Sequence, residues 1–536
     1  MAVSLVQGVS GVLPTSVTYT TAGGTSTTVQ NKLNEFLTTQ DYGADPTGTA
    51  NSASNLNTAF ATNKNLIGTT GTYTSSTSVT FGSQTYSTGY ATTHTSTATD
   101  HGYQLESGSQ VEGGQWNCTG NAPTWNVATT VNNASIRNAL IQNTSTSNSI
   151  SVYLDAANIT NVQLTGTYIT SNGYGVLTNP GGSVDGLMVT GNIIRTAAEP
   201  VEINAPSGAV HQNITVSGNV LAATVAGSGH ISGFGVGIAA GKNIAVVGNS
   251  IPQSGWEAFH IEDAQYNLAF VGNVAQNVSG DGFQAGQGPG TGDGIVAVGN
   301  QLKSASSAAG TYGFNMTYTG SGSLPGSIVS NNKFTNFPVG ILGSSTDSIY
   351  ANNVVNTATT AGLEANGGGW MYGTNLIKNS ATLIKSLQST VIGGVLSDSN
   401  PTTILDTSAH TAGTMGTTIK DEVCFRGLSA SVPGTTGGTT TAISLFTLPK
   451  LLRGRIIVRA TNQANAAGWV YASADLTWDG TTLTVASNLT KANGTFANAT
   501  PFFTNSTGSL AIEMYSSNNG ALTFTFDVIF KGEWFN

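Results

Sequence analysis

An internal repeat in the middle of the chain constrains the fold more than any other feature of the sequence. Copies of a short apolar alternation closed by Gly-Asn end at Asn192, Asn219, Asn249, Asn273 and Asn300. Altered copies end at Thr167, Asn332, Asn353 and Asn375. Successive copies therefore end 21 to 32 residues apart. This period predicts a solenoid, in which each repeat is one supersecondary unit that buries its apolar face against its neighbours.

A second element follows each copy. It consists of a small residue, an apolar residue and a further alternation, and it begins at Gly175, Pro200, Gly235, Ala258, Gly282, Gly313, Gly340 and Gly362. Two or three short strands therefore fit into each repeat, and no helical periodicity accompanies them. The pattern predicts an all-β fold, a right-handed parallel β-helix. Leucine-rich repeats are the main alternative, but their helical half and their leucine spacing are missing.

The recurring asparagine has a physical role in such a fold. Asparagine tolerates left-handed backbone geometry, and stacked copies of its amide can hydrogen-bond from one coil to the next. We therefore expect a ladder of asparagines along the solenoid.

The composition argues against several classes of protein. Only 8% of the residues are charged, where about 25% is usual, and 39% are apolar, which is enough for a large core. The net charge of −9 argues against a nucleic-acid partner, because phosphate binding relies on clustered Lys and Arg. No segment approaches the roughly 18 apolar residues of a membrane span. No set of His and Cys residues has metal-ligand spacing, so no metal is predicted. The glycine-rich stretch 286–294 lacks the Lys-Ser/Thr of a phosphate-binding loop, so no cofactor is predicted either.

The repeat divides the chain into predicted parts. These are an N-terminal segment at residues 1–30, a capping motif with a short amphipathic helix at 31–62, the β-helix at 63–410, and a C-terminal β-sandwich at 421–536. A cap is needed because the first coil otherwise exposes a strand edge and the end of the core. The C-terminal strands lie at irregular intervals between Gly, Asn and Thr turns, as is typical of a sandwich. The first residues lack the pattern of a signal peptide, so synthesis in a cytoplasm is expected.

The capping motif resembles a known family. It contains Phe36 and the stretch Tyr42-Gly43-Ala44-Asp45-Pro46-Thr47-Gly48, followed by the predicted helix. This arrangement resembles the motif that opens the β-helix of bacteriophage tailspikes and other pectate-lyase-like proteins, with Tyr in place of Phe and two residues inserted before the final Gly. The order of the parts along the chain resembles tailspikes more than secreted pectinases.

The resemblance implies a homotrimer on a virion tail. Its N-terminus would attach to other phage tail proteins, and its C-terminal domain would assist trimerisation or bind glycan. Many such spikes bind and cleave a bacterial surface polysaccharide, either capsule or O-antigen, during host adsorption. The resemblance therefore implies this polysaccharide as a partner and polysaccharide cleavage as an activity.

Aligning the second elements places polar residues in ladders along the solenoid. With Val201, Val236, Phe259, Phe283 and Phe314 pointing into the core, the residues after them point outward. These outward residues are Glu202, Gly237, His260, Gln284 and Asn315. Two positions before the inward residues stand Glu199, Phe234, Glu257, Asp281 and Tyr312. We expect a turn to expose this second set, because burying an unpaired carboxylate is costly.

The stretch from Glu199 to Asp281 concentrates carboxylates in a chain that has few charges. Glycoside hydrolysis commonly uses one protonated carboxyl group as an acid and a second that activates water or attacks directly. Neighbouring carboxylates raise one another's proton affinity, which favours such an acid. We predict Glu257 and Asp281 as the catalytic pair and Glu202 and Glu262 as substitutes. Which member of the pair is the acid stays open.

Other residues of this stretch are candidates for binding sugar. His260 could bind a hydroxyl group or tune a carboxylate, Gln284 lies on the outward ladder, and Trp256, Tyr266 or Tyr312 could stack on sugar rings. Each has a structural alternative. Carboxylates beside turns often accept backbone N–H groups, Glu199 before Pro200 suits a turn, and the aromatic residues suit a core or a trimer interface.

Three functions stay open from the sequence. The leading hypothesis is a tailspike that hydrolyses polysaccharide as an endo-acting depolymerase. The second is a receptor-binding spike without enzymatic activity. The third is a polysaccharide lyase, which would need Lys, Arg or a metal to neutralise a uronate carboxylate. Basic residues near the carboxylates are few, the nearest in sequence being Arg195, Lys242 and Lys303, and this favours a hydrolase over a lyase.

Overall fold

The structure of the chain, a computed structural model, divides into two compact units, Met1–Thr196 and Ala197–Asn536. The described residues are 18–19, 27–28, 31, 37–127, 130–146, 149–155, 158–179, 181–205, 211–224, 233–263, 265–287, 292–306, 311–316, 324–343, 348–365, 370–371, 375–386, 391–392, 395–397, 403–406, 418–419, 422–432, 441–447, 451–462, 469–493, 502–506, 509–514 and 522–535. Most of the predicted N-terminal segment lies outside them, apart from the antiparallel pair β1 (Thr18–Tyr19) and β2 (Thr27–Thr28).

A helical cap precedes the coils of the first unit. The 3₁₀ helix η2 (Thr39–Tyr42) ends at Gly43, whose φ of 81° is left-handed and therefore favours the glycine of the capping motif. Helix α2 (Ala53–Phe60) follows and buries one face, with the ring of Phe60 stacked 3.9 Å from that of Phe81. The predicted cap helix is therefore confirmed. Within the described residues, no helix is long and apolar enough to cross a membrane.

Parallel strands form the rest of the first unit. One ladder consists of β7 (Val79–Phe81), β10 (Tyr103–Leu105), β13 (Trp125–Val127), β17 (Ile150–Leu154) and β20 (Tyr174–Thr178). The other strands are β3 (Leu37–Thr38), β4 (Thr47–Asn51), β5 (Leu66–Ile67), β6 (Gly71–Ser75), β8 (Thr85–Ser87), β9 (Thr92–Ser96), β11 (Gln110–Glu112), β12 (Gln115–Cys118), β14 (Val131–Asn132), β15 (Ser135–Arg137), β16 (Leu140–Asn143), β18 (Asn158–Thr165), β19 (Tyr168–Ser171), β21 (Ser183–Thr190) and β22 (Ile193–Thr196).

An aromatic cluster that includes one histidine fills the core of this unit. The ring of His94 is stacked on that of Trp116 at 4.1 Å, and its Nε2 is 3.0 Å from the hydroxyl group of Tyr86. Because burial removes water from the imidazole, the pKa of His94 is lowered to about 3. This histidine is therefore a neutral core residue at ordinary pH.

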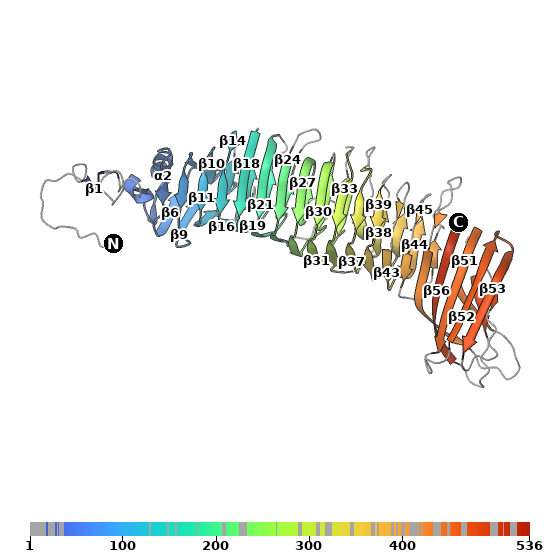
Figure 1. The fold of residues 1–536 in the computed structure, drawn as a ribbon. Coiled ribbons are helices and arrows are strands. Elements are labelled where there is room, and N and C mark those ends of the chain that lie inside the picture. The colour runs from blue at the N-terminus through green and yellow to red at the C-terminus, as the bar shows by residue number, and fades with distance from the viewer. Residues whose placement is uncertain are drawn as a thin grey trace. The chain divides into compact units, whose positions relative to one another are not determined.

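Three ladders of parallel strands build the solenoid part of the second unit, and several of these strands are labelled in Figure 1. The first contains β24 (Gln212–Ser217), β27 (Gly241–Val247), β30 (Gln265–Val271), β33 (Ile295–Val298), β36 (Ile328–Ser330), β39 (Ile349–Ala351), β42 (Trp370–Met371), β45 (Val391–Ile392) and β48 (Thr418–Ile419). The second contains β25 (Val220–Ala223), β28 (Ser250–Gln253), β31 (Val274–Val278), β34 (Gln301–Ser304), β37 (Lys333–Thr335), β40 (Val354–Asn356), β43 (Asn375–Lys378) and β46 (Val395–Ser397). The third contains β23 (Val201–Ile203), β26 (Val236–Ile238), β29 (Phe259–Glu262), β32 (Phe283–Gln287), β35 (Tyr312–Asn315), β38 (Val339–Gly343), β41 (Ala361–Ala365), β44 (Thr382–Ser386) and β47 (Thr403–Asp406).

The third ladder keeps the register that the repeat predicts. Val201, Val236, Phe259, Phe283 and Phe314 are Cα partners on successive strands, and each is fully buried. The rings of Phe259 and Phe283 stack at 4.5 Å, so each coil packs its apolar residues directly on the next. The all-β fold with a parallel β-helix is therefore confirmed.

A buried asparagine ladder runs beside this core. Its members in the second unit are Asn219, Asn249, Asn273, Asn300, Asn332, Asn353 and Asn375. Each amide Nδ2 donates to Oδ1 of the next asparagine at 2.9 to 3.1 Å, from Asn219 through Asn353. The predicted ladder is confirmed.

The predicted left-handed geometry belongs to the residue before each ladder asparagine from Asn219 to Asn353. Gly248 has a φ of 63° and Gly272 a φ of 64°, whereas the asparagines that follow them do not have positive φ values. Where glycine is replaced, Asn331 and Asn352 take this conformation with φ values of 56° and 57°. The change from Gly-Asn to Asn-Asn therefore preserves both the left-handed position and the ladder position.

The C-terminal residues form antiparallel sheets. The larger contains β49 (Glu422–Val432), β51 (Leu451–Asn462), β52 (Trp469–Trp478), β53 (Leu483–Asn493) and β56 (Leu522–Phe535). The smaller contains β50 (Thr441–Thr447), β54 (Phe502–Ser506) and β55 (Ser509–Met514). Asp479 accepts from the backbone N–H groups of Thr481 and Thr482 at the turn that joins β52 and β53 into an antiparallel hairpin. The parallel ladders meet the larger sheet where β46 pairs with β49.

Candidate active site

The predicted polar residues lie on consecutive strands of the third ladder. Glu202, Gly237, His260, Gln284 and Asn315 are Cα partners on β23, β26, β29, β32 and β35. They alternate with core residues, as the sequence predicts. Most of them are nevertheless covered by their neighbours, since His260 is only 2% exposed.

Two carboxylates lie just before β29 and β32. The N–H of Gly235 donates to the carbonyl oxygen of Glu257 at 3.0 Å, and the N–H of Ala258 donates to that of Asp281 at 3.1 Å. These bonds place Glu257 and Asp281 on adjacent coils. The expected exposure of this set is wrong, since Glu257 is 2%, Asp281 7% and Glu199 3% exposed. Polar partners within the fold replace the water that these carboxylates lose.

His260 holds two of the carboxylates. Its Nδ1 is hydrogen-bonded to Oε2 of Glu257, and its Nε2 lies 2.6 Å from Oε1 of Glu262. The ring of Phe234 is stacked on the imidazole at 4.0 Å. Burial disfavours the imidazolium, but the hydrogen bonds to Glu257 and Glu262 outweigh it and raise the pKa of His260 to about 9. His260 is therefore a cation at neutral pH and forms ion pairs with both carboxylates.

Asp281 is held by the coil that follows it. Its Oδ1 accepts from the N–H of Tyr312 at 2.8 Å, and its Oδ2 accepts from Nδ2 of Asn315 at 2.7 Å. The same Asn315 amide donates to Oε1 of Gln284 at 2.6 Å. Burial raises the pKa of Asp281 to about 7, although these hydrogen bonds oppose the rise. A substantial fraction of Asp281 is therefore protonated near neutral pH.

The side chain of Glu202 extends over Gly237, its partner on the next strand, where the ladder of side chains has a gap. A methyl group added to Gly237 would lie 1.7 Å from Oε2 of Glu202, so the absence of a side chain at Gly237 admits this carboxyl group. Burial raises the pKa of Glu202 well above its usual range and that of Glu199 to about 7, and the two carboxyl groups interact with each other. We name Glu199, Glu202, Glu257, His260, Glu262 and Asp281 the acidic cluster.

The aromatic candidates are divided between two ladders. Trp256 is half-buried next to Glu257, and Tyr312 is half-buried on β35, where burial and the charges of Glu364 and Asp281 raise its pKa. Tyr266 is 41% exposed but lies on β30 of the first ladder. Of the three aromatic candidates, Trp256 and Tyr312 therefore lie beside the acidic cluster, and Tyr266 lies on another ladder.

Several contributors were not predicted as site residues. Phe234 covers His260, Asn315 holds Asp281, and the outward column continues through Leu342 to Glu364, which pairs with Lys385 at 3.4 Å. Alignment of the repeats already placed Phe234 two positions before an inward residue and Asn315 directly after one. Their contacts, however, depend on side-chain directions that period alone does not give.

The arrangement is suited to acid–base chemistry. It combines a carboxyl group that titrates near pH 7, a neighbouring carboxylate fixed by an imidazolium, and partly exposed groups at Glu262 and Tyr312. In the described part of the chain, no set of three or more His, Cys, Asp or Glu residues is placed to hold a metal ion.

Comparisons with known proteins find likeness only among solved structures. No protein-family model and no curated protein matches the sequence. The structure is similar to the tailspike protein of E. coli bacteriophage HK620 in complex with a pentasaccharide, at 12% identity over 96% of this chain and 97% of that chain, with a TM-score of 0.44. A mutant of that tailspike, also with pentasaccharide, matches at 12% identity over 97% of both chains with a TM-score of 0.49.

These solved structures are tailspikes, the class that the capping motif resembles in sequence. A third, with hexasaccharide, matches at 11% identity over 96% of this chain and 97% of that chain, with a TM-score of 0.44.

Proposed function

We propose that the chain is a phage tailspike that binds a bacterial surface polysaccharide and hydrolyses it at the acidic cluster. The observation that supports hydrolysis is the placement of Asp281, with a pKa of about 7, on the coil next to Glu257. A carboxyl group that is protonated near neutral pH next to a second carboxylate is the pairing that glycoside hydrolysis uses.

The two carboxyl groups take different roles in this proposal. Asp281 donates its proton to the glycosidic oxygen as the bond to the anomeric carbon breaks. Glu257, paired with the His260 cation, supports attack at that carbon in one of two ways. It either takes a proton from the water molecule that attacks or bonds to the anomeric carbon itself. His260 and Phe234 position Glu257, and Asn315 positions Asp281.

The surroundings suit an uncharged stretch of glycan. Tyr312, Trp256 and Gln284 lie next to the pair and offer aromatic faces and an amide for sugar rings and hydroxyl groups. We assign the protein to a virion tail as a homotrimer, with attachment through the N-terminal segment, on the sequence resemblance of residues 36–48 and of the order of parts.

A spike that binds without cleaving is the second candidate. The 2% exposure of Glu257 supports it, because a carboxylate that no water or sugar reaches is a structural ion-pair partner of His260. The two candidates differ in a measurable product and not only in affinity.

The test is an assay for new reducing ends on a panel of purified capsular and O-antigen polysaccharides. We expect reducing ends from the wild type and a loss of about 100-fold or more in Asp281→Asn and Glu257→Gln, the range for a general acid or base. Asp293→Asn, an exposed carboxylate in the same unit, is the matched control and should keep full activity.

Each other outcome has a defined meaning. Binding of a polysaccharide without any product supports the binding spike, and unsaturated products that absorb in the ultraviolet overturn hydrolysis in favour of a lyase. Full activity in both cluster variants, with retained polysaccharide binding, refutes the site. In the wild type, activity should fall as pH rises through about 7, because Asp281 then loses the proton that it donates.

A further inference from the structure

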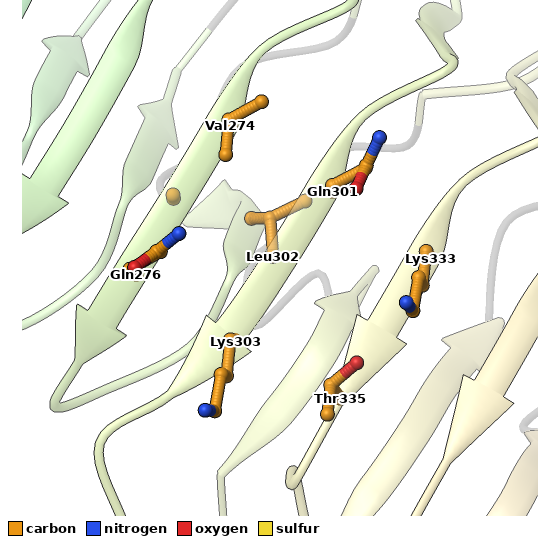
Figure 2. Close-up of a pocket in the computed structure, with 8 residues that line it drawn as sticks. Val274, Gln276, Gln301, Leu302, Lys303, Lys333 and Thr335 are labelled. Carbon is orange, nitrogen blue, oxygen red and sulfur yellow. The ribbon is translucent and has the colours of Figure 1, made fainter.

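A hollow of about 280 Å³ lies on the second ladder of the second unit, on strands other than those that carry the acidic cluster. Figure 2 shows the side chains that three neighbouring strands, β31, β34 and β37, contribute to it. The exposed or half-buried ones are Val274, Gln276, Gln301, Lys303, Lys333 and Thr335. Gln301 is opposite Lys333 and Lys303 opposite Thr335, so the two lysines are diagonal neighbours across adjacent strands.

The charge around this hollow is entirely positive. Neither Lys303 nor Lys333 has a carboxylate partner among the described residues, and no acidic residue lines the hollow. The chain has only 17 basic residues and a net charge of −9, so two neighbouring unpaired lysines stand out. Like charges on neighbouring strands repel, and an anion bound between them would convert this repulsion into attraction.

The remaining groups fit a sugar ring. The amides of Gln276 and Gln301 and the hydroxyl group of Thr335 can hydrogen-bond to sugar hydroxyl groups, and Val274, 38% exposed, offers an apolar surface to a ring face. The volume is just below the range of about 300 to 1,000 Å³ for drug-sized ligands, which suits a single sugar residue.

We propose that this hollow binds the carboxylate of an acidic sugar residue in a glycan. The proposal rests on the proposed function only in taking a glycan as the ligand. With only two lysines, the site fits a polysaccharide whose acidic residues are separated by neutral ones, not a densely anionic polymer. Binding here would anchor the chain on a face separate from the acidic cluster.

The test is a titration of the full-length protein with D-glucuronic acid, followed on its lysines. Reductive methylation with ¹³C-formaldehyde keeps each lysine positively charged and gives each an NMR signal, which Lys303→Gln and Lys333→Gln assign. We expect both signals to shift and saturate with glucuronate and to stay in place with D-glucose. The signal of Lys242, an exposed lysine on β27, is the internal control and should not move.

Four results would overturn the proposal. They are no saturable shift, an equal response to glucose, an equal shift at Lys242, and an equal response to sodium sulfate. The last result would mean that the hollow binds any anion and does not recognise the sugar. The Lys303→Gln/Lys333→Gln double variant lacks both signals, so its binding is followed by isothermal titration calorimetry, in which it should lose the glucuronate binding that the wild type shows. Glu257→Gln leaves the hollow intact and should respond like the wild type, so this titration can fail or succeed whether or not the acidic cluster hydrolyses glycan.

Discussion

Replacement of Asn273 by alanine should weaken the solenoid locally and strongly. The Asn273 amide donates to the carbonyl oxygen of Val246 at 2.9 Å and to Oδ1 of Asn300 at 2.9 Å. Its Oδ1 accepts from both the backbone N–H and Nδ2 of Asn249 at 3.0 Å. Asn273→Ala removes these four hydrogen bonds from a site that is fully buried.

The cost follows from the groups that are left behind. Nδ2 of Asn249 keeps its bond to the carbonyl oxygen of Val216, and Oδ1 of Asn300 keeps the backbone N–H of residue 273. The backbone N–H of Asn249 and the carbonyl oxygen of Val246 lose the amide as partner. At about 1 to 3 kcal/mol for each of these two buried groups, we expect a loss of about 2 to 6 kcal/mol.

Hydrogen exchange followed by mass spectrometry measures this loss, because repeat proteins open locally. We expect faster exchange in peptides that cover residues 244–251 and 268–275, and little change in the first unit. Asn267→Ala is the matched control, because Asn267 lies on the same coil but is exposed, and its amide donates to Oδ1 of Asn243 at 3.0 Å. It should cost about 1 kcal/mol, mainly from its left-handed backbone. Equal effects of the two substitutions would refute the ladder as a source of stability.

Three further predictions concern other positions. Gly237→Ala should lower the thermal midpoint by displacing the Glu202 side chain. The same substitution made in a Glu202→Ala variant should lower the midpoint of that variant only slightly. Equal losses in the wild type and in Glu202→Ala would contradict the proposed gap at Gly237. The first unit should lose stability as pH falls from 6.5 toward 3, because the unfolded chain protonates His94 and the folded one does not; a pH scan of His94→Phe should lack that component. Asn331→Gly should be nearly neutral in denaturant unfolding, whereas Asn331→Val should cost about 1 to 2 kcal/mol, and similar values for the two would argue against the left-handed assignment.

The fold could be predicted because two periods coincide in the sequence. Alternation identifies the strands, and the recurrence of Gly-Asn and of the small-apolar element sets the register from coil to coil. The Cα partners of Phe259, Phe283 and Phe314 follow directly from that alignment. The left-handed residue was assigned one position too late, because Gly and Asn both tolerate that geometry and only the backbone distinguishes them.

The candidate site was predicted less completely. Alignment placed Glu257, His260 and Asp281 on adjacent coils, yet it did not show that they are buried. Their burial depends on contacts between side chains of neighbouring coils. Phe234 packs on the imidazole of His260, and Asn315 donates a hydrogen bond to Asp281. A one-dimensional pattern gives the order of residues in a ladder but not the direction in which each long side chain turns.

The asparagine ladder makes every coil an interchangeable unit of length. Each coil presents an amide donor to one neighbour and an amide oxygen to the other, whatever the number of residues in its loops, which here varies the spacing between 21 and 32 residues. A coil that carries its own left-handed residue and its own asparagine can thus be duplicated or removed while the two flanking coils still match. The reach of such a protein can change in whole steps of one strand spacing, about 4.8 Å, without redesign of either end.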